Sequence, residues 1–197
     1  MVKHRSVAAV TRVRSPLGTH AKRLWYTFYM ATTYFQGNYL HPQHISVGGI
    51  LANKKGEICC HHFYTKNLKG YWADEKLDDF YILMRETLEP DETLEHALYR
   101  GLQEEFGATG KIIDYVGSIK STFKHKEIDI EKTTLYFLCE LISQDLSKRA
   151  EDDIESKSTV EWQTSDYLIP LMKAQATRFG RTDVDESSIL ERMKTRK

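Results

Sequence analysis

Two adjacent glutamates, Glu104 and Glu105, end an amphipathic segment and have the spacing best suited to chemistry in this sequence. On a helix, position 101 lies three and four residues before them and therefore shares their face. Carboxylates at this spacing direct several hard oxygen ligands at one point, which suits Mg²⁺ or Mn²⁺. The pattern predicts a divalent-metal site, although it is also typical of a solvated acidic helix face.

The helix that carries these glutamates is predicted over Asp91–Phe106. Its apolar residues recur at helical spacing, namely Leu94, Ala97, Leu98 and Leu102. Asp91 or Thr93 can accept hydrogen bonds from the free N–H groups of the first turn. Gly107 supplies the left-handed stop after the last turn.

The segment from Glu86 to Ala108 resembles a Nudix box, whose family pattern is G-x5-E-x7-R-E-U-x-E-E-x-G-U, with U a bulky aliphatic residue. Six positions agree with this pattern, namely Glu92, Arg100, Leu102, Glu104, Glu105 and Gly107. Arg100 follows Glu92 by eight residues, so the two share one side of the helix and form a predicted structural brace for the preceding loop. Over residues 44–178, a glycine-bearing strand, a Lys-Lys-Gly hairpin and a late Glu-Trp strand before a helix are also similar to Nudix domains.

The box departs from the family pattern at two important positions, besides the small Ala108 at its end. Glu86 stands where the family has its first box glycine. Gly101 replaces the glutamate after the arginine, which in the family contributes to metal binding or base catalysis. A glycine inside a helix costs about 0.8–1 kcal/mol relative to alanine, so no local gain in stability explains it. Glu86 is therefore a candidate replacement metal ligand.

The resemblance implies a Nudix-type pyrophosphohydrolase acting on an acid anhydride. Its expected reaction is Mg²⁺- or Mn²⁺-dependent cleavage of a diphosphate linkage in a nucleoside diphosphate derivative, weakened by the loss of a glutamate at position 101. Metal ions held by Glu104 and Glu105 would neutralise the diphosphate and polarise an attacking water. The alternative is a catalytically impaired Nudix-like module that binds a nucleotide or RNA without cleaving it.

Many Nudix relatives draw a further carboxylate from a late loop. Here that loop carries four acidic residues, namely Glu151, Asp152, Asp153 and Glu155. Glu155 is included among the candidate metal ligands, but spacing does not choose between these residues. An ordinary solvated loop remains the alternative.

A basic cluster near the end of the first strand after the box supplies the candidate phosphate-binding residues, Lys120, Lys124 and Lys126. A charged loop is the alternative interpretation. The run Cys59-Cys60-His61-His62 invites a zinc site, but adjacent strand residues point to opposite faces and no second pair has finger-like spacing. Packing on a half-buried strand is the favoured role of this run.

Elements predicted around the helix come from apolar alternation and from turn residues. Strands are predicted over 44–53, 57–64, 80–84, 111–123, 132–141 and 159–163, long polar segments over 65–79 and 143–158, and a second helix over 165–178. This order predicts an α/β (α+β) fold, a Nudix-like α/β/α sandwich with a mixed central sheet.

Residues 44–178 are the predicted domain, preceded by a basic, aromatic-rich, β-rich extension over 1–43 with one or two strands in 23–40. A polar tail or frayed helix is predicted over 179–197. Residues 1–56 hold eight basic and no acidic residues, which leaves a balance of −8 in the remainder. This split favours either a basic arm for phosphate-rich partners or an extension docked on an acidic domain.

The aromatic residues of the extension are assigned to a core or to a homodimer interface. They are Trp25, Tyr26, Phe28, Tyr29, Tyr34, Phe35 and Tyr39. Their combination with Arg12, Arg14, Lys22 and Arg23 leaves binding of single-stranded RNA open, because bases stack on aromatic rings while cations follow phosphates.

Composition is that of one globular domain: 197 residues, 41% hydrophobic, 28% charged, with a net charge of zero. No apolar run approaches the roughly 18 residues that span a bilayer, and no secretory signal is recognised at the N-terminus. Three cysteines, an odd number, argue against a disulfide framework and for a reducing compartment. We therefore expect a cytoplasmic protein without a membrane partner.

Overall fold

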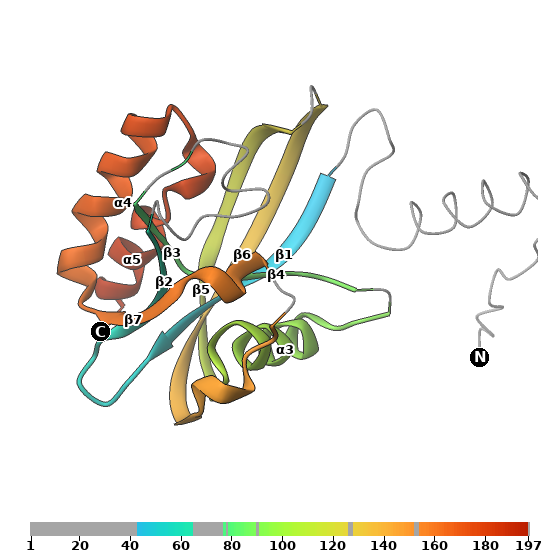
Figure 1. The fold of residues 1–197 in the computed structure, drawn as a ribbon, viewed down its shortest axis with the longest axis vertical. Helices are drawn as coiled ribbons and strands as arrows, with labels where there is room; N and C mark the ends of the chain where they lie inside the picture. Colours follow the sequence, from blue (N-terminus) through green and yellow to red (C-terminus); the bar gives the residue numbers. More distant parts are fainter. Residues whose placement is uncertain are drawn as a thin grey trace, which may run out of the picture.

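The computed structural model describes residues 43–64, 77, 79–89, 91–125, 128–151 and 154–196 (Figure 1). Except for Gln43, the predicted N-terminal extension 1–43 lies outside these residues, as does nearly all of the predicted loop 65–79. The strands are β1 (Gln43–Ala52), β2 (Ile58–Phe63), β3 (Phe80–Ile82), β4 (Met84–Thr87), β5 (Ala108–His125), β6 (Ile128–Gln144) and β7 (Thr159–Gln163). The α-helices are α3 (Leu94–Phe106), α4 (Ser165–Phe179) and α5 (Ser187–Lys194). Short 3-10 helices η2 (Leu146–Lys148) and η3 (Ile154–Lys157) lie between β6 and β7, and η4 (Thr182–Val184) lies between α4 and α5.

The strands form one mixed sheet with the order β3-β2-β1-β6-β5. Strand β1 runs parallel to β6, and the other pairs are antiparallel. Strands β1 and β2 pair with each other only at Ala52 and Ile58. Away from this point β1 pairs with β4, whereas β2 pairs with β3 and β7, so the sheet divides into two halves.

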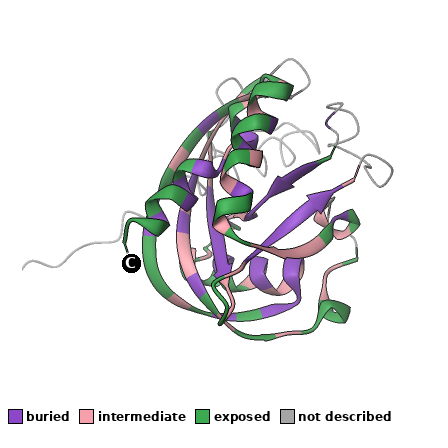
Figure 2. Ribbon diagram, turned by 90° about the vertical axis from the view of Figure 1, so that its left-hand side faces the viewer, coloured by how far each residue is buried: buried purple, intermediate pink, exposed green. Residues whose placement is uncertain are grey.

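Helix α3 covers one side of the sheet, and α4 and α5 cover the other (Figure 1). Alternation along β1 sends Val47 and Leu51 into the core beneath α3, while Ile50 enters the core beneath α4 and α5. Figure 2 shows these strands as buried ribbons between the more exposed helices. The predicted α/β/α sandwich with a mixed sheet is confirmed.

Several predicted element boundaries differ from the structure. Helix α3 begins at Leu94, because the Thr93 side chain accepts a hydrogen bond from the backbone N–H of His96, whereas Asp91 lies before the helix with φ +59°. The strand predicted over 80–84 is two strands separated at Leu83, which pair with different partners. Strands β5 and β6 extend beyond their predicted ends, since ladder hydrogen bonds need no apolar side chains.

The C-terminal segment is packed, which corrects the prediction of a polar tail or frayed helix. Val184, Ile189 and Leu190 are buried, and Ile189 and Leu190 pack in the core on the side of α4. Glu186 is also buried and accepts a hydrogen bond from the backbone N–H of Leu83 at 2.6 Å. The apolar residues of this segment lie on one helical face, a signal that its polar average composition hides.

The three cysteines are buried free thiols. Within the described part of the chain, no helix combines the length and apolar character required to cross a membrane.

Candidate active site

Arg100 joins helix α3 to the segment that precedes it. Its Nε and Nη2 each donate to one carboxylate oxygen of Glu92 at 2.9 Å, and Nη2 also donates to the backbone carbonyl of Thr87 at 3.0 Å. The Arg100 hydrogen bonds hold the pKa of Glu92 below its usual range, and those from Arg100 to Glu92 raise the pKa of Arg100. The structure therefore brings the two predicted brace residues together in a bidentate pair.

Glu105 lies in the interior at the last turn of α3, with 3% of its side chain exposed. Its Oε2 lies 2.7 Å from Nε2 of His61, a fully buried β2 residue whose Nδ1 lies 2.6 Å from the Ser158 hydroxyl. Burial first, and then the charges of Arg149 and Arg85, hold the pKa of His61 well below its usual value. The His61 ring thus bridges the Glu105 carboxylate and the Ser158 hydroxyl, which itself donates to the backbone carbonyl of Glu155 at 2.8 Å, and the Nε2 contact fixes the orientation of the carboxylate.

Glu104 has a different environment from its neighbour. Its side chain is 41% exposed, and its Oε2 lies 3.3 Å from Nη1 of Arg100. The paired glutamates at the end of α3 therefore comprise one buried carboxylate positioned by a histidine and one surface carboxylate positioned by an arginine.

Gly101 packs directly against β4. A Cβ atom at this position would lie 2.7 Å from Sδ of Met84 and 2.8 Å from Cβ of Glu86. Real Cβ atoms essentially never approach so closely, so tertiary packing against β4 accounts for this glycine, which helix propensity alone does not explain. The place of the family glutamate is filled by side chains of β4.

Glu86, the candidate replacement ligand, lies next to position 101. One of its oxygens accepts a hydrogen bond from the backbone N–H of Thr87 at 2.9 Å and lies 3.1 Å from Nη1 of Arg100. Its carboxylate is thus part of the Arg100 cluster.

The Nudix resemblance implies a divalent metal ion, and the side chains that could bind one can be compared with that expectation. Among residues 43–196 apart from the undescribed positions, no group of three or more His, Cys, Asp or Glu side chains is arranged to hold a metal ion. Magnesium often takes only one or two protein carboxylates and completes its shell with waters and substrate phosphates. Glu104 and Glu105 supply two carboxylates at the end of α3, the number that such a shell needs, and a preformed site with three carboxylates is not found among the described residues.

Arg149 is a site residue that the sequence reasoning did not identify. Its Nε donates to the backbone carbonyl of Glu105 at 2.6 Å, and its Nη2 donates to that of Glu155 at 2.7 Å. It therefore ties the end of α3 to the late loop that carries Glu155. Glu151 is exposed, and the other two predicted carboxylates of that loop lie outside the described residues. The only signal for this role in the sequence is a single arginine in the polar segment 143–158, which is rich in Asp and Glu.

The predicted phosphate-binding lysines lie on the β5–β6 hairpin. Lys120 is exposed, with its Nζ 3.1 Å from Glu131, and Lys124 is exposed as well. Lys126 lies outside the described residues. In the ladder Lys120 pairs with Thr133, and the adjacent pair is Ser121 with Lys132. Neighbouring residues on a strand face opposite sides, so Lys132 is on the other face from Thr133.

Lys132 is half-buried, and of the acidic residues that act on its charge only Glu105 belongs to the box. Burial first, and then the charge of Arg85, lower its pKa to about 8, against opposing effects from Glu155, Glu105 and Glu186. Alternation along the strand is the sequence signal that could have identified this lysine. Lys132 lies on the same face of β6 as the buried Thr134 and Tyr136.

His62 points to the opposite side of β2 from His61. Its Nε2 lies 2.7 Å from Asp79 and its Nδ1 lies 2.8 Å from Glu161, while its ring stacks on Tyr81 at 4.0 Å. Both ring nitrogens of His62 therefore face carboxylate oxygens, and the His61–His62 pair is divided between the two faces of the sheet.

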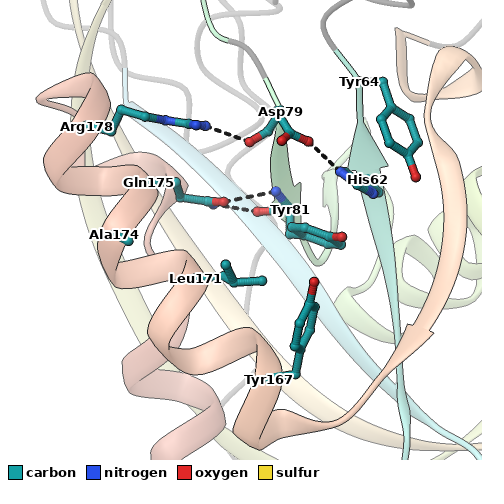
Figure 3. Close-up of a pocket in the computed structure, with 9 residues that line it drawn as sticks. All are labelled: His62, Tyr64, Asp79, Tyr81, Tyr167, Leu171, Ala174, Gln175 and Arg178. Atoms are coloured by element: carbon teal, nitrogen blue, oxygen red, sulfur yellow. Dashed lines mark hydrogen bonds and ion pairs between the residues drawn. The ribbon is translucent and has the colours of Figure 1, made fainter.

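A pocket of about 600 Å³ opens beside His62, between α4 and the ends of β2 and β3 (Figure 3). Tyr81 and Tyr167 line it, and Arg178 at its rim donates to the backbone carbonyl of Asp79. Because His62 and His61 face opposite sides of β2, this pocket does not contain the paired glutamates of α3.

Comparison with known proteins agrees with the geometry. A family model described as the NUDIX domain matches residues 42–182. No protein with a curated function matches the chain. Among solved structures, the NUDIX hydrolase from Nitrosomonas europaea has 14% identity and a TM-score of 0.50, with 68% of this chain and 79% of that chain covered. At this identity the likeness concerns the fold alone.

Two further solved structures are similar over most of their own length. The MutT protein from Methanosarcina mazei Go1 has 19% identity and a TM-score of 0.48, covering 73% of this chain and 96% of that chain. The E. coli ORF135 protein has 16% identity and a TM-score of 0.49, covering 79% of this chain and 91% of that chain.

Proposed function

Because the chain belongs to the Nudix family, we propose that it is a Nudix hydrolase that cleaves a diphosphate linkage in a nucleoside diphosphate derivative. The observation that carries the proposal is the pair Glu104–Glu105 at the end of α3, in a helix held to its preceding segment by the Arg100–Glu92 pair. Without a role for the pair, a buried Glu105 would be a costly residue to keep at this position.

Glu104 and Glu105 would hold Mg²⁺ or Mn²⁺ together with the substrate phosphates. A bound divalent ion supplies charge neutralisation for the diphosphate and lowers the pKa of a coordinated water. His61 keeps one oxygen of Glu105 fixed through its 2.7 Å hydrogen bond, as is usual for partners of ligating carboxylates. Arg100 restrains Glu104 on the surface side of the same turn.

Weakened catalysis is part of the proposal. Gly101 leaves the centre one carboxylate short of the family set, and the close packing against β4 leaves no space for a side chain there. With fewer protein ligands, more of the metal shell must come from water and substrate, so we expect low metal affinity in the absence of substrate.

The second candidate function is a module that binds a nucleotide without hydrolysing it. The closed position 101 favours it, because a family carboxylate that serves in metal binding or base catalysis is missing and the candidate replacement, Glu86, lies 3.1 Å from Nη1 of Arg100. Binding of RNA and homodimer formation both concern the N-terminal extension, which lies outside the described residues, and they stay predictions, as does the cytoplasmic location.

Hydrolysis assays with Mg²⁺ on a panel of nucleoside diphosphate derivatives separate the two candidates. The hydrolase is expected to release product, and Glu105→Gln is expected to abolish release while leaving the protein folded. Glu140→Gln is the matched control, since Glu140 is an exposed glutamate on β6. Tight nucleotide binding without turnover would instead establish the binding module, and neither binding nor turnover would contradict both functions.

A further inference from the structure

The C-terminal end of α3, which carries the paired glutamates, is held by residues 144–150. The last carbonyl groups of a helix have no N–H partner within the helix. Here the carbonyls of residues 104–107 accept in turn from the backbone N–H of Ala150, Nε of Arg149, Nε2 of Gln144 and the backbone N–H of Asp145, at 2.9, 2.6, 3.1 and 2.9 Å. The backbone of this turn is therefore positioned by one short segment.

Arg149 extends these contacts to the late loop. Its Nη2 donates to the backbone carbonyl of Glu155 at 2.7 Å and to the Ser158 hydroxyl at 3.1 Å, and its Nη1 donates to the Ser158 carbonyl at 3.2 Å. A guanidinium presents its donors in a rigid planar fork, whereas a lysine ammonium is a point charge on a flexible stem. Joining the end of α3 to residues 155–158 in this way therefore requires an arginine.

Glu105 is held at its main chain and at its side chain by one connected set of contacts. Its carbonyl accepts from Arg149, while its carboxylate Oε2 lies 2.7 Å from Nε2 of His61. The Ser158 hydroxyl closes the ring, since it accepts from Arg149 and lies 2.6 Å from Nδ1 of His61. A shift of the guanidinium would therefore displace Ser158 and, through it, the imidazole that orients the carboxylate.

We propose that Arg149 is a positioning residue of the metal site, acting on the Glu105 carboxylate through Ser158 and His61. This inference rests on the proposed function, because it takes Glu105 to be a metal ligand. Position 101 is a glycine, so a misplaced Glu105 leaves Glu104 as the remaining expected box ligand. Replacing residues that orient metal ligands typically lowers metal affinity by about 10- to 100-fold.

Binding of Mn²⁺ is the first readout, measured from the EPR signal of the free ion as protein is added. Arg149→Met is expected to weaken binding by at least about tenfold. Ser158→Ala removes one hydroxyl from the ring and is expected to weaken binding by a similar factor, so this variant decides the outcome if Arg149→Met does not fold. Arg149→Lys keeps the charge without the fork, and we expect it to bind Mn²⁺ as weakly as Arg149→Met.

Arg178→Met is the matched control, because Nη2 of Arg178 also donates to a backbone carbonyl, at 2.6 Å, on the opposite side of the sheet from α3. It is expected to leave Mn²⁺ affinity within about twofold, since distant sites act independently. Thermal unfolding of each variant verifies that it is folded. Wild-type Mn²⁺ affinity in folded Arg149→Met or Ser158→Ala would show a purely structural role and overturn the inference. Full affinity in Arg149→Lys, or no Mn²⁺ binding by wild type, would overturn it as well.

Nucleotide hydrolysis, measured separately with Mg²⁺, keeps the inference and the proposed function distinguishable. Mn²⁺ binding that depends on Arg149, in a protein without hydrolytic activity, would support the inference and remove the hydrolase. Hydrolysis that disappears in Glu105→Gln, together with unchanged Mn²⁺ binding in Arg149→Met, would support the hydrolase and remove the inference.

Discussion

Gly101→Ala tests whether close packing against β4 keeps the family carboxylate out of the box. At an unhindered position inside a helix, this change stabilises a protein by about 0.8–1 kcal/mol. Here the new methyl group would meet Sδ of Met84 at 2.7 Å and Cβ of Glu86 at 2.8 Å. The Met84 atoms belong to the flexible end of a side chain, whereas Cβ of Glu86 moves only with the backbone of β4.

The expected net effect is a loss of stability. Overpacking of a close contact costs about 1–3 kcal/mol, which exceeds the helix gain, so we expect Gly101→Ala to lower the free energy of unfolding by about 1 kcal/mol. For a protein of this size that corresponds to a fall in Tm of about 2–4 °C. Gly101→Glu, which restores the family residue, is expected to destabilise the fold further and to give no gain in activity.

A double-mutant cycle with Met84→Ala isolates the contact. Met84→Ala alone removes a fully buried side chain and is expected to cost about 2–5 kcal/mol. In that background two of the three closest atoms around position 101 are absent, so Gly101→Ala should cost less by about 1 kcal/mol. Urea unfolding of the four proteins measures this coupling.

Stabilisation by Gly101→Ala of the size found at ordinary helix positions, with no coupling to Met84, would refute this explanation. Position 101 would then have room for a side chain, and the missing carboxylate would need another cause.

Two further predictions concern charged groups. Glu92→Gln is expected to cost about 1.5–3 kcal/mol at pH 7, because charged hydrogen bonds to Arg100 are lost. Folding lowers the pKa of Glu92, so its carboxylate contributes fully to the free energy of unfolding above the unfolded pKa. In urea unfolding, the stability difference between Glu92→Gln and wild type should therefore vanish as the pH falls through the folded pKa. Lys132→Met is expected to stabilise the fold by up to about 3 kcal/mol at pH 7, because a folded pKa of about 8 against 10.5 opposes the charged form. That gain should shrink from pH 8 to 10.5 in the same assay, and a variant less stable than wild type at pH 7 would contradict it.

Much of the fold follows from local sequence signals. Strand signals in β1 and the helical spacing of Leu98 and Leu102 predict these elements, and the structure adds the sides of the sheet on which they pack. The division of the strand at Leu83 could not be predicted, because five consecutive apolar or aromatic residues give no sign that the chain changes partners. Packing of the C-terminal segment was also hidden, since Glu186 is buried by tertiary contacts with Leu83 and Tyr136.

The candidate site likewise combines features that the sequence predicts with features that only the tertiary structure reveals. A spacing of eight residues predicts the Arg100–Glu92 pair, but Glu92 lies before α3, which begins at Leu94, so the pair joins the helix to its preceding segment and not two turns of one helix. The partners of Glu105 come from β2 and from the segment before β7, distant in sequence, and no local pattern marks them. For the lysines, the choice between strand faces depends on register, and a shift of one residue exchanges an exposed lysine for an interior one.

The charges at this site are best understood together rather than residue by residue. The loss of the glutamate at position 101 removes one negative charge from the box, while Glu86, in place of the first box glycine, adds one that lies 3.1 Å from Nη1 of Arg100. Packing against β4 keeps position 101 closed, so Glu104 and Glu105 are the expected protein ligands of the metal. The diphosphate should therefore contribute more to metal binding here than the protein carboxylates do.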